Sequence, residues 1–217
     1  PLVTVAVHRL LLAILHRNFG PENGHAWQRL REAGCFDRTV LVAYCDRWRS
    51  RFDLFDPERP FFQVVGIDPA CEDTIGRLRH DLSSGNAPLF SHAADHADLA
   101  LSAGDAALYL VAHQAFSIGG FLKFERGQDP AIYKSAKSGP LLNSAVALVR
   151  GDSLFETLLL NLHRYSVRDG VPFPVEGHDL PAWERDEMPT AAARRPAGYL
   201  DLLTWQSRRA TLLPEGG

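Results

Sequence analysis

The sequence predicts a helix-rich α+β fold with short strands. Apolar residues recur at helical spacing in several stretches of the chain. Short runs of β-branched and aromatic residues, such as Phe61 to Val65, separate these stretches and favour strands. With 217 residues, 46% of them hydrophobic, the chain is long enough to bury a sizeable core.

The helices are predicted from apolar spacing together with start and stop signals. Val3, Val7 and Leu11 place an apolar face on the first stretch, and Gly20 followed by Pro21 ends it. Ser153-x-x-Glu156 has the spacing of a capping box at the start of another helix. The predicted helices are 2–18, 25–33, 38–51, 70–82, 105–116, 154–165 and 198–206.

Strands are predicted over 61–65, 145–150 and 208–213 because each is a short apolar run bounded by turn residues. Residues 91–103 are polar and Ala-rich, and 127–141 mix Gly, Pro, Ser and Lys, so both are predicted as surface loops. Prolines make most of 169–197 irregular. The fold is therefore expected to combine helices with short strands and long connections.

The composition excludes several classes of protein. With 23% charged and 46% hydrophobic residues, the chain is not intrinsically disordered. No apolar run approaches the ~18–20 residues of a membrane span, and no signal peptide is visible. Cys35, Cys45 and Cys71 are an odd, widely spaced set, which predicts a reducing, cytoplasmic setting without a disulfide framework. Cys45 is expected to pack in the core.

Basic residues are concentrated in one part of a chain whose net charge is -3. All three lysines, Lys123, Lys134 and Lys137, lie there with Arg126 and Arg150, against two acidic residues. Lysine and arginine neutralise phosphates without reading sequence. Residues 121–150 are therefore a candidate for nucleic-acid contact, with a solvated surface loop as the alternative.

Two glycines, Gly119 and Gly120, follow the helix predicted over 105–116. Glycine at such a place either ends the helix or lets the backbone approach a ligand closely. The residues by themselves leave both interpretations open.

A metal site is the alternative chemistry. His92 and His96 are four residues apart, which on a helix puts both imidazoles on one face. A catalytic metal needs a third ligand, and His113 is the nearest further histidine. The alternative function is therefore a metal-dependent hydrolase using His92, His96 and His113. A polar loop with incidental histidines is the simpler interpretation, and no serine-nucleophile or phosphate-cradling motif is present. We predict no catalytic residue, metal or cofactor.

Seven segments of the chain match the motifs of one known family in the same order. The segment Phe52 to Gln63 has the pattern F-x-L-F-x-P-x-x-P-F-x-Q. The other matching segments are Leu11 to Arg17, Gly85 to Phe90, Gln114 to Phe121, Gly139 to Gly151, Phe155 to Leu162 and Tyr199 to Arg209. No single match is diagnostic, but their shared order along nearly the whole chain is specific. In these segments the chain resembles the CasA family, the large subunits of type I-E CRISPR Cascade complexes.

The resemblance implies a non-enzymatic, cytoplasmic subunit of a crRNA-guided antiviral complex. In the family, this subunit reads the PAM in double-stranded target DNA through the minor groove and helps to open the duplex. It also recruits the helicase-nuclease that degrades the target. The implied partners are double-stranded target DNA, crRNA, the other Cascade subunits and the helicase-nuclease, and no membrane is implied. Family chains are about twice as long, so residues 1–217 are expected to be part of an N-terminal domain, without the family's C-terminal four-helix bundle.

The resemblance also carries two loops onto this sequence. A loop that helps to bind nucleic acid is expected from Phe90 to about Ala103, and a glycine-bearing loop that meets the PAM minor groove is expected over Ser117 to Gly120. Close backbone approach, which glycine permits, suits the minor groove. The predicted nucleic-acid-binding residues are Phe90, Ser91, His92, Ser117, Gly119, Gly120, Lys123, Arg126, Lys134 and Lys137. A purely structural protein–protein module built on helices 2–18 and 154–165 remains an alternative.

Overall fold

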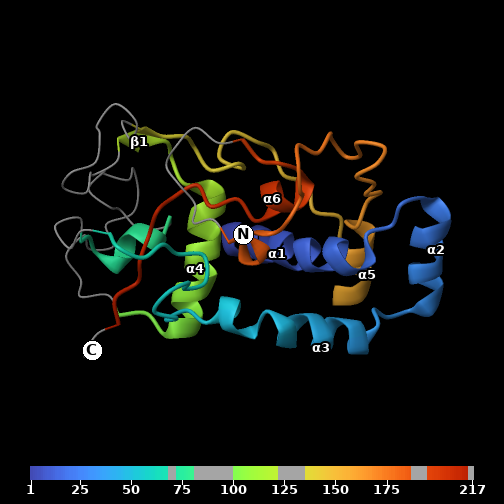
Figure 1. The fold of residues 1–217 in the computed structure, drawn as a ribbon, viewed down its shortest axis with the longest axis horizontal. Helices are drawn as coiled ribbons and strands as arrows, with labels where there is room; N and C mark the ends of the chain where they lie inside the picture. The colour runs from blue at the N-terminus through green and yellow to red at the C-terminus, as the bar shows by residue number, and fades with distance from the viewer. Residues whose placement is uncertain (68–71, 81–99, 122–134, 187–194, 215–217) are drawn as a thin grey trace.

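A computed structural model of the chain describes residues 1–67, 72–80, 100–121, 135–186 and 195–214. Helices dominate it (Figure 1). The longest helix, α1 (Leu2–Phe19), lies at the centre, and α4 (Ala103–Phe116) runs across one end of it. The remaining elements are α2 (Gly24–Ala33), α3 (Arg38–Arg47), α5 (Leu154–Leu160), α6 (Tyr199–Leu203), and the short 3-10 helices η1 (Arg49–Phe52), η3 (Ile75–Leu78) and η4 (Ala182–Glu184).

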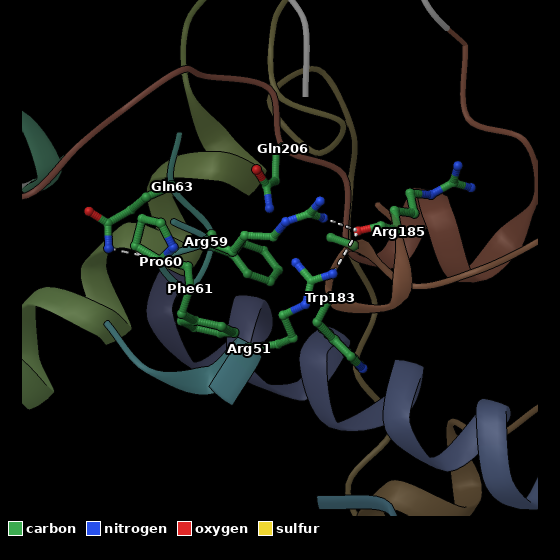
Figure 2. Close-up of a pocket in the computed structure, with 10 residues that line it drawn as sticks. Arg51, Arg59, Pro60, Phe61, Gln63, Trp183, Arg185 and Gln206 are labelled. Carbon is green, nitrogen blue, oxygen red and sulfur yellow. Dashed lines mark hydrogen bonds between the residues drawn. The ribbon is translucent and has the colours of Figure 1, made fainter. Parts of the chain in front are cut away.

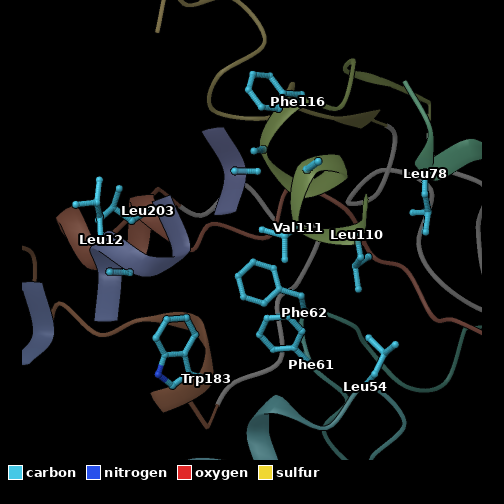
Figure 3. Packing of buried hydrophobic residues seen from close by; sticks show 14 of the residues in the cluster. Leu12, Leu54, Phe61, Phe62, Leu78, Leu110, Val111, Phe116, Trp183 and Leu203 are labelled. Atoms are coloured by element: carbon cyan, nitrogen blue, oxygen red, sulfur yellow. The ribbon is translucent and has the colours of Figure 1, made fainter. Parts of the chain in front are cut away.

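The core lies where α1 meets α4 and α6. Leu110 of α4 is completely buried, and the adjacent Phe61 and Phe62 pack against each other with ring centroids 4.7 Å apart. Trp183 of η4 closes the cluster from the other side, with its ring 5.1 Å from that of Phe52 (Figure 3). Burying large side chains of this kind contributes roughly 1.5–3 kcal/mol each. The contacts of α1 with α4 and α6 are therefore expected to supply much of the free energy that stabilises the fold.

Side-chain caps fix where most helices begin. Asn23 accepts the amide N–H of Ala26 at 2.9 Å at the start of α2, and Asp37 accepts that of Thr39 at 2.7 Å at the start of α3. Ser102 and Ser153 accept amide N–H groups at the starts of α4 and α5. The predicted cap at Ser153 is confirmed, but the return bond of the capping box is shifted by one residue: Glu156 accepts the main-chain N–H of Asp152, at 2.7 Å, in place of that of Ser153.

Six of the seven predicted helices are confirmed with changes at their ends, and the helix predicted over 70–82 is wrong in its described part. The largest change is in the helix predicted over 154–165, which stops at Leu160. Asn161 ends it because its side-chain amide donates to the carbonyls of Thr157 and Val149, each at 2.7 Å. The helix predicted over 198–206 is limited to α6, and within the described part of 70–82 the only helical turn is η3.

Cys45 corrects an expectation about α3. The helix turns Leu41, Tyr44 and Trp48 toward the core, at spacings of three and four residues. Cys45 is one residue, and therefore about 100° of rotation, away from Tyr44, and it is exposed. Helical spacing alone did not show which of two adjacent faces the core would cover.

The three predicted strands are wrong. Val146 and Val149 are 43% and 51% exposed, so 145–150 is neither regular nor buried. Segments 61–65 and 208–213 do lie side by side, but a single main-chain hydrogen bond in the described part of the chain joins them, from Val64 to Ala210 at 3.0 Å. The next contact between the two segments is made by a side chain and not by the backbone: Oε1 of the buried Gln63 accepts the N–H of Leu212 at 2.6 Å.

The sheet that the structure does describe is a two-stranded antiparallel ribbon, β1 (Gly120–Phe121) with β2 (Ser135–Ala136). It lies next to the C-terminal end of α4, where only turns and loops are predicted from sequence (Figure 1). The chain is therefore mostly helical, and the α+β expectation holds for its helices but not for the predicted strands.

Helix α1 also corrects the expectation about membrane spans. Its 18 residues have a mean hydropathy of 1.3. Among the described residues, α1 is therefore the one helix that is both long enough and apolar enough to cross a bilayer. Length and composition are weak evidence, however, because core helices pass the same test. Ala13 and Leu15 of α1 lie in the core described above.

Candidate nucleic-acid interface

The predicted glycine-bearing turn begins where α4 ends. Ser117 stops the helix: its hydroxyl donates to the carbonyl of His113, and its amide N–H donates to the same carbonyl at 3.0 Å. Ser117 itself is buried, whereas the next residue, Ile118, is 71% exposed. The chain therefore leaves the core abruptly, and Ile118 and Gly119 lie at the surface just before β1.

Residues 135–141 lie along this turn. The amide N–H of Gly139 donates to the carbonyl of Ser117 at 2.7 Å, and that of Leu141 donates to Ala115 at 3.0 Å. A Cβ on Gly139 would lie 2.6 Å from the carbonyl oxygen of Ala115, so glycine is required for this close approach. The contact places the exposed Lys137 beside the turn.

Arg208 joins the two segments. Its guanidinium donates to the carbonyl of Ile118 and, at 2.8 Å, to the carbonyl of Lys137. Both acceptors are neutral, and no carboxylate in the described part of the chain forms an ion pair with Arg208. Burial lowers the pKa of this guanidinium, but arginine stays protonated at neutral pH. We call the contact of Arg208 with these two carbonyls the clamp. It adds a positive charge next to that of Lys137.

Gln114 holds Arg208 in position from inside the molecule. The Gln114 side chain is 1% exposed, and its Oε1 accepts the amide N–H of Arg208 at 2.7 Å. Its Nε2 donates to the carbonyls of Arg208 and Phe62, at 2.8 Å and 3.2 Å. One buried amide thus links α4, the 61–65 segment and the 207–208 segment.

The structure brings four of the ten predicted binding residues together: Ser117, Gly119, Gly120 and Lys137. Gly120 pairs with Ala136 in the ribbon, so it is a strand residue and not part of a free loop. The other six lie outside the described residues: Phe90, Ser91, His92, Lys123, Arg126 and Lys134. Of the loop expected from Phe90 to about Ala103, only its end is described, where Ser102 caps α4.

Arg208 was missed by the sequence analysis. It lies in the matching segment Tyr199 to Arg209, but it is one of 20 arginines and follows no charge pattern. Its role depends on contacts 71 and 90 residues away, with Lys137 and Ile118. No spacing rule within the sequence predicts contacts of that range.

The metal alternative gains nothing from the described residues. His113 lies in α4 with its Nδ1 buried and unpaired, and its ring stacks on that of His80 with centroids 5.5 Å apart. Burial is the main reason that the pKa of His113 falls to about 4, and the charges of His80, Arg208 and Arg77 lower it further. Within the described ranges no three His, Cys, Asp or Glu side chains form a metal-binding group, while His92 and His96 lie outside them.

Comparison with known proteins gives one consistent family. A curated relative from Thermus thermophilus, "CRISPR-associated protein CasA/Cse1", is 35% identical over 223 residues, which covers 100% of this chain and 42% of the relative. A crystal structure of CasA from Thermus thermophilus superposes with a TM-score of 0.78 at 32% identity, over 100% of this chain and 41% of that one.

Two further structures agree. Cse1 from Acidimicrobium ferrooxidans gives a TM-score of 0.71 at 36% identity, over 99% of this chain and 40% of that one. A chain of a "CRISPR RNA-guided surveillance complex" gives 0.71 at 25% identity, over 94% of this chain and 42% of that one. The present chain thus spans about 42% of the curated relative. Because the model of the family "CRISPR-associated protein Cse1" also matches residues 1–217, the chain belongs to the Cse1 family.

Proposed function

We propose that this chain is part of the N-terminal domain of the large, non-catalytic subunit of a type I-E Cascade complex in the cytoplasm. In that role the subunit works with crRNA and the other Cascade subunits. It recognises the PAM in double-stranded target DNA, aids strand opening and recruits the helicase-nuclease. Membership of the Cse1 family supports this proposal, as does the likeness to a chain of a CRISPR RNA-guided surveillance complex.

One observation carries the DNA-recognition part: an exposed turn that is held by the guanidinium of Arg208 and by a main-chain N–H. The carbonyl of Ile118 is held by Arg208, and the carbonyl of Ser117 is held by Gly139. The turn therefore has a defined shape before any ligand arrives, which lowers the entropy lost on binding.

The chemistry of the turn suits the minor groove. Gly119 adds no side chain that would keep the backbone away from the base edges. Ile118, 71% exposed, is an apolar side chain of the kind that minor-groove proteins press against base steps. Lys137 and Arg208 supply charge for the flanking phosphates. Shape and apolar contact would then read the PAM, and the basic groups would contribute affinity without sequence preference.

An electrophoretic shift assay tests the proposal. It uses the complete protein reassembled with its crRNA complex, on duplexes with and without candidate PAMs. Gly119→Val is expected to abolish PAM-dependent binding, because two γ-methyl groups would stand between the turn and the groove. Lys134→Ala with Lys137→Ala is expected to weaken binding to all sequences alike.

Two outcomes contradict the proposal. Binding that is indifferent to the PAM and to all three substitutions would leave this chain as a structural module. A Gly119→Val protein that unfolds, shown by loss of its cooperative thermal transition, would assign Gly119 to helix termination alone. Ile118→Ser then tests the same surface, since its exposed side chain can change without disturbing the core.

A further inference from the structure

A small basic pocket lies between η1, the 60–63 segment, η4 and Gln206, with a volume of about 40 Å³. Pro60, Phe61 and Trp183 form its apolar walls, and the side chains of Arg51 and Arg59 enter it from neighbouring turns (Figure 2). This volume holds a few water molecules or one tetrahedral oxyanion, at ~10–15 Å³ for each water. It is too small for a nucleobase or a drug-sized ligand.

The two guanidiniums in the pocket are incompletely neutralised. Both donate to the carbonyl of Arg185, from Arg51 at 3.4 Å and from Arg59 at 3.3 Å (Figure 2). Both also approach one carboxylate, that of Asp186, at 3.3 Å and 3.6 Å. Among the described residues no other carboxylate pairs with either guanidinium, and the Asp186 side chain is 93% exposed. Two positive charges thus share one weakly held negative charge.

The other charged group at the pocket does not change this balance. The guanidinium of Arg185 turns away from Arg51 and Arg59 (Figure 2) and pairs with Asp201 at 3.2 Å. Counted over the residues that the structure describes, the pocket is therefore left with an excess of one positive charge.

Gln206 adds a polar group that lacks a partner. Its Oε1 is buried and makes no hydrogen bond to any described residue. In Figure 2 the amide nitrogen of Gln206 lies on the side of Arg59, so this group can present its N–H donors to the pocket. Two guanidiniums and an amide N–H are the donor set that an oxyanion requires, and the planar fork of arginine matches phosphate.

We propose that this pocket binds one phosphodiester group of a nucleic-acid backbone. The proposal rests on the proposed function and extends the interface to a second site. Gln206 at the pocket and Arg208 at the clamp are two residues apart, so their Cα atoms are at most ~7 Å apart. The same short segment of chain therefore borders both the pocket and the Arg208 contact. An isolated acidic side chain of a protein partner would neutralise only one of these positions, which favours the nucleic acid.

Two substitutions with opposite expected effects test this site in the complete protein within its crRNA complex. Arg51→Gln with Arg59→Gln removes both guanidiniums. It is expected to weaken binding to duplexes with and without the PAM equally, by about threefold to tenfold, and to reduce the salt slope by about one. Asp186→Asn removes the competing carboxylate and is expected to strengthen binding. Since Asp186 is almost fully exposed, that variant folds even if the arginine pair proves essential for folding.

The matched control is Arg29→Gln with Arg38→Gln. It removes the same charge from the exposed surface of α2 and α3, and it is expected to change affinity less than twofold. Gly119→Val, run in parallel, separates this proposal from the proposed function. Loss of PAM dependence in Gly119→Val, with unchanged affinity and salt slope in the arginine pair and in Asp186→Asn, overturns the pocket alone.

Indifference of every variant overturns both proposals. Competition with a polyglutamate peptide decides between the two kinds of partner. If the peptide displaces the duplex from the complex, and no longer does so in the Arg51→Gln, Arg59→Gln variant, the site is assigned to a protein instead. Inability of the peptide to compete, together with a reduced salt slope in the arginine pair, supports the phosphodiester.

Discussion

The guanidinium of Arg208 donates a hydrogen bond to the main-chain carbonyl of Ile118, 90 residues earlier in the chain. A second N–H of the same group reaches the carbonyl of Lys137 at 2.8 Å. One side chain thus fixes both the exposed turn after α4 and the segment beside it. Within the described residues Arg208 forms no ion pair with a carboxylate. Its guanidinium can therefore hold the turn in place and also attract a phosphate group.

Arg208→Ala is expected to reduce duplex affinity more than Lys137→Ala does, because it removes a charge and also releases the turn. Arg208→Lys keeps the charge but cannot form the same two-pronged contact, so it is expected to give an intermediate loss. Electrophoretic shift measurements with the assembled complex check this order. Arg168→Ala, on an 88% exposed side chain elsewhere, is the control. Equal affinities for Arg208→Lys and Arg208→Ala would show that the charge alone has no role.

Gly139→Ala is expected to lower the free energy of unfolding by about 1–3 kcal/mol. The added Cβ would lie 2.6 Å from the Ala115 carbonyl oxygen and 2.9 Å from the Phe116 nitrogen, and both are backbone atoms that cannot move aside cheaply. Gly24→Ala is the matched control: nothing lies within 4 Å, and the residue is in α2, so alanine is expected to stabilise slightly. Denaturant titration of the two proteins measures the difference, and equal midpoints would contradict the prediction.

Gln114→Leu is expected to destabilise the protein by about 3 kcal/mol, since it leaves one buried and two partly buried main-chain groups without this partner. These are the N–H and carbonyl of Arg208 and the carbonyl of Phe62. Gln28→Leu, which removes only an exposed contact to Glu32, is expected to change stability by less than about 0.5 kcal/mol. Thermal or chemical unfolding distinguishes the two. Comparable losses in both variants would mean that the Gln114 amide contributes no more than a surface contact.

Acid is expected to destabilise the fold through two buried histidines. Burial is the main reason that the pKa of His16 falls to about 3 and that of His113 to about 4. His163 lowers the first further, and His80 and two arginines lower the second. Both rings stay neutral in the folded state, whereas the unfolded chain takes up protons near pH 6.5. The contribution of these two neutral rings to the free energy of unfolding is therefore fully present above pH 6.5. It is lost as the pH falls toward 4 for His113 and toward 3 for His16.

At pH 5 each histidine is expected to cost roughly 2 kcal/mol relative to pH 7.5. Melting temperatures at the two pH values measure this loss, and His113→Phe is expected to reduce it by about half. Comparing one variant with itself at two pH values cancels any change in packing. His25→Gln, at an exposed position in α2, is expected to leave the pH dependence unchanged. A His113→Phe protein as acid-sensitive as the parent would sink the assignment.

Six of the seven helices were predictable because their signals are local. The Ser153 cap and the stop at Gly20 act within one turn of chain, and both operate in the structure as the sequence predicts. The strands were not predictable, because a strand needs a partner. Segments 61–65 and 208–213 lie side by side, but they do not form a regular pair of strands. Phe62 has a positive φ of 55°, and the Gln63 side chain makes a hydrogen bond that main-chain atoms would make in a sheet.

The candidate site divides in the same way. Ser117 and Gly119 stand out in the sequence because two glycines directly after an apolar helix mark either its end or a close backbone approach. Lys137 stands out because all three lysines of the chain lie close together. Arg208 does not stand out, and neither do Arg51 and Arg59, since arginines occur throughout the chain.

The amino-acid sequence was sufficient to predict the family of this protein, six of its helices and the place of the exposed turn. These depend on residues that are neighbours along the chain or on motifs that keep their order. Which polar groups meet became clear only from the three-dimensional contacts: Gln114 with Arg208, Arg208 with Ile118, and Arg51 with Arg59 around one carboxylate. The physical reason is that such contacts form only after the core around α1 and α4 brings distant segments within hydrogen-bonding distance.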